Sequence, residues 1–243
     1  MALASTLDLL AYSPPGWGAN LLRGLQNSVL IACGAYAMGL SIGICGAYGK
    51  LYGGPILRDL LGVYTTIVRA VPELVLILIL YYGVTDAINQ MLVLNGFGRI
   101  QLSGLAAGII VLGVVQGAYA TEVLRGAILA VPAGQIEAAR AMGMPPLALA
   151  RRITLPTMMS FAIPGLANLW LVVTKDTALL AVVGFGELTQ ETRQAAGSTK
   201  AYFTFFMAAG VLYLALSLVS GRIFARIEAW ARRGEPSLSG SGQ

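Results

Sequence analysis

The stretch "QIEAARAMGMPPLALARRITLP" (residues 135–156) lies between two long apolar segments and decides how the chain is organised. It carries Glu137 and Arg140 in a chain that has 57% hydrophobic and only 11% charged residues. Residues 135–142 are good helix formers, and Gly143 before two prolines predicts where that helix ends. By physical chemistry alone, the stretch fits an interfacial helix that reconnects two membrane spans as well as it fits a surface that docks a partner.

The composition predicts an all-α membrane protein that crosses the bilayer several times. A mean hydropathy of +0.75 is too high for an ordinary soluble domain, and the apolar runs are too long for barrel strands. We expect five transmembrane helices, at about 27–48, 60–82, 102–124, 153–180 and 202–224. Gly39 and Gly43 suit close helix packing in the first span. We expect Pro156 and Pro164 to interrupt the fourth.

One transmembrane domain, residues 27–230, is expected to make up nearly the whole chain. Residues 1–26 are interpreted as a periplasmic or interfacial segment, and residues 231–243, which end in Ser and Gly, as a disordered cytoplasmic tail. Two sets of basic residues would face opposite sides of the membrane. The larger set is Lys50, Arg58, Arg125, Arg140, Arg151, Arg152, Arg222, Arg226, Arg232 and Arg233, and the smaller is Arg23, Arg99, Arg193 and Lys200. The positive-inside rule therefore places the N-terminus outside and the C-terminus and loop 132–156 inside.

The residue types argue against an enzyme and against a nucleic-acid partner. The formal charge of +5 lies at the ends of apolar segments rather than on an extended basic face, which indicates lipid and not nucleic acid. The chain contains no histidine, and we find no metal-ligand cluster or nucleophile with a general base. Its only Gly-Lys pair, Gly49-Lys50, lacks the rest of a phosphate-binding loop. We therefore expect no cofactor in this chain.

Polar and ionisable residues inside spans are costly, so they are candidates for a substrate path. The candidates are Arg69, Glu73, Glu122, Asn168, Lys175, Asp176 and Thr177. Several also have a structural interpretation. Arg69 and Glu73, four residues apart, could neutralise each other on one helix face, and Glu122 could bind a cationic substrate or pair with a partner subunit. Lys175 could receive a substrate carboxylate or pair with a neighbouring helix or subunit.

The stretch at residues 135–156 resembles the EAA signature of permease subunits of bacterial ABC importers. The matching positions are Glu137, Ala138, Ala139, Gly143, Ile153, Leu155 and Pro156. In that family this loop docks in a groove on the ATPase subunit, so the resemblance implies a type I ABC importer permease fold. The segments "GAYATEVLRGAILAVPAGQIEAARAMGM" (117–144) and "IPGLANLWLVVTKDTALLAVVG" (163–184) resemble the polar amino-acid uptake branch. Glu73 resembles the subunit type of histidine/lysine/arginine/ornithine and opine importers.

This resemblance implies a permease of the bacterial inner membrane that imports polar, and in particular basic, amino acids or opines. Its implied partners are an ATPase dimer that binds ATP and Mg, a second related permease subunit and a periplasmic solute-binding protein. An alternative is a stand-alone secondary transporter, which the odd number of spans and the absence of a visible repeat disfavour. A second alternative is a membrane scaffold in which the buried charges only hold helices together.

Overall fold

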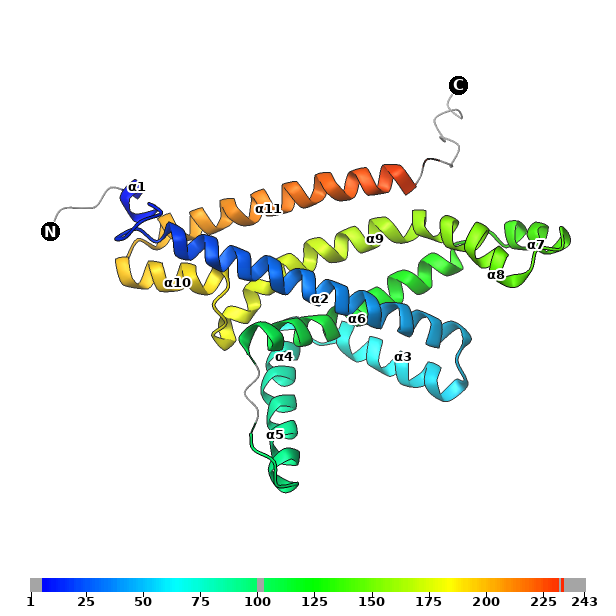
Figure 1. The fold of residues 1–243 in the computed structure, drawn as a ribbon, viewed down its shortest axis with the longest axis horizontal. Helices are drawn as coiled ribbons and strands as arrows, with labels where there is room; N and C mark the ends of the chain where they lie inside the picture. The colour runs from blue at the N-terminus through cyan, green and yellow to red at the C-terminus, as the bar shows by residue number, and fades with distance from the viewer. Residues whose placement is uncertain (1–5, 100–102, 232, 234–243) are drawn as a thin grey trace.

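The computed structural model describes residues 6–99, 103–231 and 233, which form helices joined by short loops (Figure 1). In chain order they are α1 (Thr6–Leu9), α2 (Gly18–Tyr52), α3 (Pro55–Ala70), α4 (Glu73–Leu78), η1 (Ile79–Val84), α5 (Thr85–Leu94), α6 (Gly104–Leu129), α7 (Ala133–Ala141), α8 (Pro146–Leu149), η2 (Ala150–Thr154), α9 (Leu155–Asp176), η3 (Thr177–Val183), α10 (Leu188–Thr199) and α11 (Tyr202–Ala231). The predicted all-α class is confirmed.

Among the described residues, five helical stretches are long and apolar enough to cross a membrane, as predicted. They are Gly18–Tyr52, Glu73–Leu94, Gly104–Leu129, Pro146–Val183 and Tyr202–Ala231. Helices α2, α6, α9 and α11 run lengthwise through the bundle (Figure 1). Helix α10 lies where α2 begins, and α7 and α8 lie at the opposite end (Figure 1). We call these two regions the α10 end and the α7 end of the bundle.

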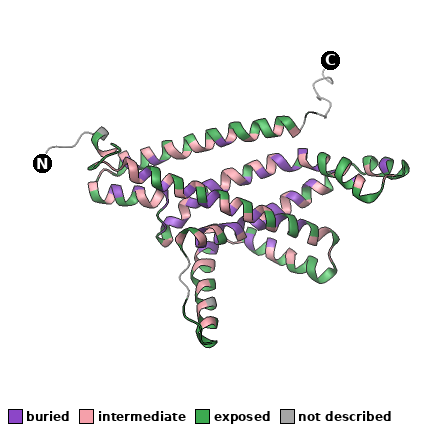
Figure 2. Cartoon of the chain, in the orientation of Figure 1, coloured by how far each residue is buried: buried purple, intermediate pink, exposed green. Residues whose placement is uncertain are grey.

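Helices α2 and α6 form the most extensive contact between any two elements, and glycines on α2 make it close. A Cβ atom added at Gly43 would lie 2.5 Å from Cβ of Ala120 and 2.9 Å from its backbone carbonyl carbon. One added at Gly39 would lie 2.8 Å from Cβ of Gln116. The prediction that Gly39 and Gly43 serve helix packing is therefore confirmed. Buried residues are most frequent in α6 and also occur along one side of α2 and α9, whereas α11 and α3 have few (Figure 2).

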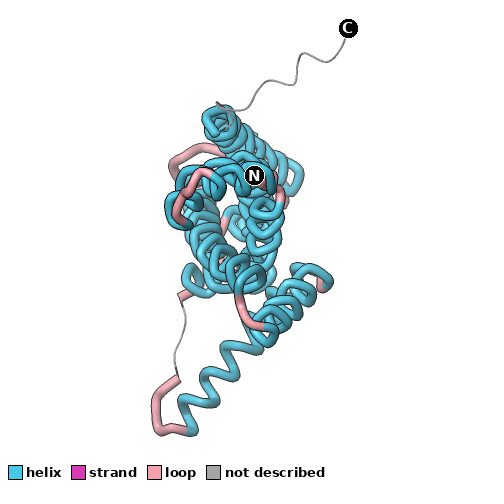
Figure 3. Tube along the Cα trace, turned by 90° about the vertical axis from the view of Figure 1, so that its right-hand side faces the viewer, coloured by secondary structure: helices cyan, strands magenta, loops and turns pink. Residues whose placement is uncertain are grey.

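The second span differs from the prediction of residues 60–82, which is wrong. Helix α3 ends at Ala70, and Val71 is extended, with φ −91° and ψ 138°. A residue before proline is disfavoured in the α conformation, and Pro72 has no N–H to continue the helix. The chain restarts at Glu73 and continues through η1 and α5, which leaves the bundle at an angle (Figures 1 and 3). The break therefore divides one apolar run between two helices.

The predicted interruption of the fourth span at Pro156 and Pro164 is also wrong, because α9 is continuous from Leu155 to Asp176. Pro156 is the second residue of α9, and proline is tolerated in the first turn of a helix. The irregular part lies earlier, in the π-helical segment η2. The ends of three other spans also move: α2 begins at Gly18, α6 ends at Leu129 and α11 extends to Ala231. Residues 232 and 234–243 of the expected tail lie outside the described residues.

Replacing Gly43 with Ala should destabilise the purified chain by about 1–3 kcal/mol, because the added methyl group meets the backbone of Ala120, which no rotamer change can move. Thermal unfolding in detergent, followed by circular dichroism, measures the effect. Gly210→Ala in α11 is the matched control, since nothing lies within 4 Å of a Cβ atom there. Equal stability of the two variants would contradict the packing role of Gly43.

Candidate functional site

The helix of the stretch at residues 135–156 is α7, Ala133–Ala141, and it ends as predicted at Gly143. Gly143 has φ +72°, its N–H donates to the carbonyl of Arg140 at 2.9 Å, and the N–H of Met144 donates to that of Ala139 at 3.1 Å. These two bonds form a Schellman motif, which needs a left-handed residue. No atom lies within 4 Å of a Cβ added at Gly143. Its backbone conformation therefore favours glycine there, with no packing requirement within the chain.

Most residues of the EAA signature lie uncovered at the α7 end. Glu137, Ala138, Gly143, Leu155 and Pro156 are exposed, whereas Ile153 is half-buried and Ala139 is buried. The apolar side chains of Met142 and Leu147 are also 86% and 82% exposed there. Exposed apolar side chains grouped with charged ones are typical of an interaction surface.

Helix α7 is attached to the start of α9 rather than held only by its loops. The hydroxyl of Thr157 donates to Oε1 of Gln135 at 3.3 Å. A hollow of about 550 Å³ separates the two elements, and Ala139, Met144 and Ile153 contribute to its wall. The Thr157–Gln135 hydrogen bond therefore links the first turn of α7 to the first turn of α9.

A polar cluster of Glu73, Gln116, Tyr119 and Asp176 lies inside the bundle, where α4, α6 and α9 meet. Nε2 of Gln116 donates to Oδ2 of Asp176 at 3.3 Å, and the two residues are only 2% and 8% exposed. Glu73, at the start of α4, lies within electrostatic range of Asp176 and of Tyr119. The fold thus brings together two acidic residues that are 103 positions apart in the sequence, 73 and 176.

The polar cluster has acceptors that the chain leaves without strong donors. Oε1 of Gln116 is buried and has no hydrogen-bond partner among the described residues. Within the same part of the chain, neither Glu73 nor Asp176 forms an ion pair with a Lys or Arg side chain. Carboxylates that face each other in a low-dielectric interior repel unless a cation joins them. An ammonium or guanidinium group would supply both the missing charge and the missing donors.

The other predicted path residues have different surroundings. Arg69 is exposed and forms no ion pair with Glu73, because the break at Pro72 removes the helical spacing on which that prediction depended. Asn168 and Lys175 are exposed on α9. Thr177 is fully buried, and its hydroxyl donates to the carbonyl of Thr174 at 2.9 Å.

Glu122 lies six residues beyond Gln116 on α6, and both its carboxylate oxygens are engaged within the chain. Oε1 accepts from Nζ of Lys50 at 2.6 Å, and Oε2 accepts from Nη2 and Nε of Arg125 at 2.8 and 3.0 Å. Nζ of Lys50 also donates to the hydroxyl of Thr65 at 2.9 Å. These bonds join α2, α3 and α6 near the α7 end. Arg125 is three residues from Glu122 in the sequence, whereas Lys50 is 72 residues away, so no local pattern points to it.

Sequence reasoning missed Glu187, whose side chain is 0% exposed at the N-terminus of α10. Its oxygens accept from the N–H groups of Thr189 and Gln190 at 2.9 and 2.8 Å, from the hydroxyl of Tyr213 at 3.0 Å and from that of Ser28 at 3.3 Å. Burial raises the pKa of the Glu187 carboxyl, and these hydrogen bonds act in the opposite direction. Its one sequence signal is a helix cap, since a carboxylate at the N-cap accepts from the first free N–H groups.

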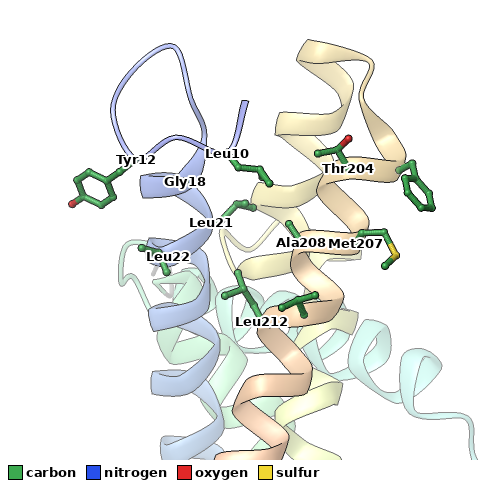
Figure 4. A pocket seen from close by; sticks show the side chains of 11 residues that line it. Leu10, Tyr12, Gly18, Leu21, Leu22, Thr204, Met207, Ala208 and Leu212 are labelled. Carbon is green, nitrogen blue, oxygen red and sulfur yellow. The ribbon is translucent and has the colours of Figure 1, made fainter. Parts of the chain in front are cut away.

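A larger hollow, of about 690 Å³, opens between α2 and α11 at the α10 end (Figure 4). Its lining side chains include Leu21, Leu22, Met207 and Leu212 (Figure 4). A polar solute would lose its hydrogen bonds to water there without replacement. The polar cluster is therefore the better candidate for binding a polar ligand.

Comparison with known proteins gives concordant matches. Residues 38–233 match the family described as "Binding-protein-dependent transport system inner membrane component". The sequence is similar to the nopaline transport system permease protein NocQ of Agrobacterium fabrum, with 43% identity covering 94% of this chain and 98% of that protein. It is also similar to the histidine/lysine/arginine/ornithine transport system permease protein HisQ of Escherichia coli, with 38% identity covering 88% and 93%.

The fold is similar to a solved structure described as "Crystal structure of an amino acid ABC transporter with histidines". The TM-score is 0.78, and the match covers 94% of this chain and all of that one at 24% sequence identity. The similarity supports the helical architecture.

Substituting Glu122 with Gln should lower the stability of the purified chain by about 1–3 kcal/mol, because Lys50 and Arg125 lose a charged acceptor in a half-buried site. The Tm should fall by about 2–10 °C. Asp59→Asn, an equivalent change at an exposed position of α3, is the control. A Tm equal to that of the control would show that the ion pairs contribute nothing.

Proposed function

We propose that this chain forms the path by which polar amino acids or opines with a cationic group enter the cell. The chain belongs to the family of binding-protein-dependent transport system inner membrane components. Members of this family are multi-pass permease subunits of ABC importers, so the chain is a transport subunit and not an enzyme. Membership also implies an ATPase and a substrate-binding protein as partners. The family name places the chain in the inner membrane.

The observation that supports a cationic substrate is the polar cluster, in which Glu73 and Asp176 lie within electrostatic range of each other and neither forms a salt bridge with a Lys or Arg of the described residues. NocQ and HisQ are named for nopaline and for histidine, lysine, arginine and ornithine, most of which carry a basic side chain. In our proposal the substrate's ammonium or guanidinium group lies between the two carboxylates and donates to Oε1 of Gln116. Lys175, exposed beside Asp176, would receive the substrate carboxylate. Asn168 and Thr177 would complete the path on α9 and η3.

Helix α7 is proposed to dock on an ATPase dimer that binds ATP and Mg. The exposed Glu137, Ala138 and Gly143, together with Met142 and Leu147, support this role, since a partner would cover them. The larger set of basic residues supports an α7 end that faces the cytoplasm, with the N-terminus outside. Movement of the ATPase would then reach α9 through the Gln135–Thr157 contact.

A second, related permease subunit is proposed to cover α5 and its neighbours. Ile79, Tyr82, Met91 and Leu94 lie exposed on this arm, which leaves the bundle (Figure 3). The arm also carries the polar residues Asp86 and Asn89 among its apolar ones. This mixture is more compatible with a protein partner on one side of the arm than with lipid on all sides. We propose a heterodimer of permeases, as inferred from the resemblance to the histidine and opine importers.

Replacing Gly143 with Val should uncouple ATP hydrolysis from uptake, because a β-branched residue strains the left-handed conformation that ends α7. In liposomes containing the complete importer, we expect uptake per ATP hydrolysed to fall at least tenfold while the complex remains assembled. Gly143→Asn is the matched control, since asparagine tolerates this conformation, and it should retain most coupling. Normal uptake by the Val variant would contradict the docking role.

Changing Asp176 to Asn should lower kcat/KM for arginine uptake about 10- to 100-fold, because a hydrogen bond to a charged group is worth about 1.5–3 kcal/mol. Uptake of a neutral amino acid such as glutamine, if imported, should change less. Glu73→Gln should also lower arginine uptake more than uptake of the neutral amino acid. Asp59→Asn, at an exposed position of α3, should change the uptake of neither. Equal loss for arginine and glutamine would refute a cation-binding role. Failure of the unmodified importer to take up any polar amino acid or opine would refute the proposed function.

A further inference from the structure

Glu187 joins three elements at the α10 end. Its carboxylate accepts from Ser28 on α2, from the first N–H groups of α10 and from Tyr213 on α11. Ser28 also accepts from the N–H of Leu188 at 3.2 Å, and Tyr213 contacts the hydroxyl of Thr189 at 3.2 Å. The N-terminal halves of α2 and α11 and the start of α10 are therefore held by one network of hydrogen bonds around a single carboxylate.

Neutral donors alone stabilise this carboxylate within the described residues. No Lys or Arg there forms an ion pair with Glu187, which is fully buried. Loss of any donor would leave a buried charge less well solvated, at a cost larger than that of an ordinary hydrogen bond. The three elements are thus expected to move together while Glu187 keeps its donors.

The network also reaches the polar cluster. Thr177, the residue after Asp176, is fully buried and lies within interaction range of the Tyr213 hydroxyl. Asp176 in turn accepts from Gln116 on α6. A series of polar residues therefore runs from Gln116 on α6, through the consecutive residues Asp176 and Thr177, to the half-buried Tyr213 on α11 and Glu187 at the start of α10.

We propose that Glu187 is a positioning residue that transmits occupancy of the polar cluster to the α10 end of the bundle. When a bound cationic group attracts the carboxylate of Asp176, the adjacent Thr177 shifts relative to Tyr213. The movement of Tyr213 then displaces α10 and α2 through its hydrogen bond to Glu187. Glu187 itself touches no substrate. This inference rests on the proposed import function and adds to it a route by which a bound substrate changes the surface where α10 lies.

The test uses the complete importer in lipid nanodiscs with its solute-binding protein, and compares basal ATPase activity with the activity stimulated by the substrate-loaded binding protein. Glu187→Gln keeps the side-chain size but puts an amide donor where one carboxylate oxygen accepts. We expect stimulation to fall about tenfold at unchanged basal activity. Tyr213→Phe, which removes only the hydroxyl, should give the same loss. The double variant should be no worse than the more affected single variant, since both act on one link.

Glu191→Gln is the matched control, because it makes the same chemical change on the same helix at a residue that accepts none of these bonds. If Glu187→Gln prevents assembly, Tyr213→Phe decides, since it leaves the carboxylate and its bonds to α10 in place. Equal loss of basal and stimulated activity, additive losses in the double variant, or unmodified stimulation in Tyr213→Phe would overturn the inference. Absence of stimulation in the unmodified importer would instead overturn the proposed function, and this inference with it.

Discussion

The close approach of α2 to α6 is the contact on which the rest of the structure depends. Helices in a bilayer gain little from hydrophobic burial against one another, so van der Waals contact between small residues has to hold them together. Gly43 against Ala120 and Gly39 against Gln116 provide that contact. Gln116 is only 2% exposed beside this contact, so its amide N–H needs an acceptor within the protein. It finds Asp176 at the end of α9, so the packing of two helices places a polar group of a third.

Three acidic sites along the bundle differ in how completely the protein satisfies them. Glu122 is matched by two cations, and Glu187 is matched by hydroxyl and backbone donors from three elements. Asp176 has one amide donor, and both a second acid, Glu73, and the exposed Lys175 lie within electrostatic range of it. Glu122 and Glu187, whose carboxylates have their hydrogen-bond partners within the chain, hold helices together at the two ends of the bundle. Asp176, whose carboxylate has fewer partners, lies between them.

Local patterns in the sequence predicted much of this architecture, and the failures have physical causes. The number of spans, the end of α7 at Gly143 and the packing role of Gly43 follow from composition and from the special properties of glycine. The run of residues 60–82 is apolar on both sides of Pro72, so hydropathy does not register the break. Glu187 lies outside the apolar runs, so a search for charges within spans passes over it. Its importance comes from partners far away in the sequence, which no local pattern reveals.

Helix α2 is 35 residues long, or about 52 Å, and therefore exceeds the hydrocarbon thickness of about 30 Å by a wide margin. It carries Ser28 in its N-terminal half and Lys50 near its C-terminal end, each bonded to a neighbouring element. A rigid rod of this length acts as a lever: a rotation of about 5° about its middle would move its ends by about 2 Å in opposite directions. One helix can thus convert a small tilt at one face of the membrane into an opposed displacement at the other.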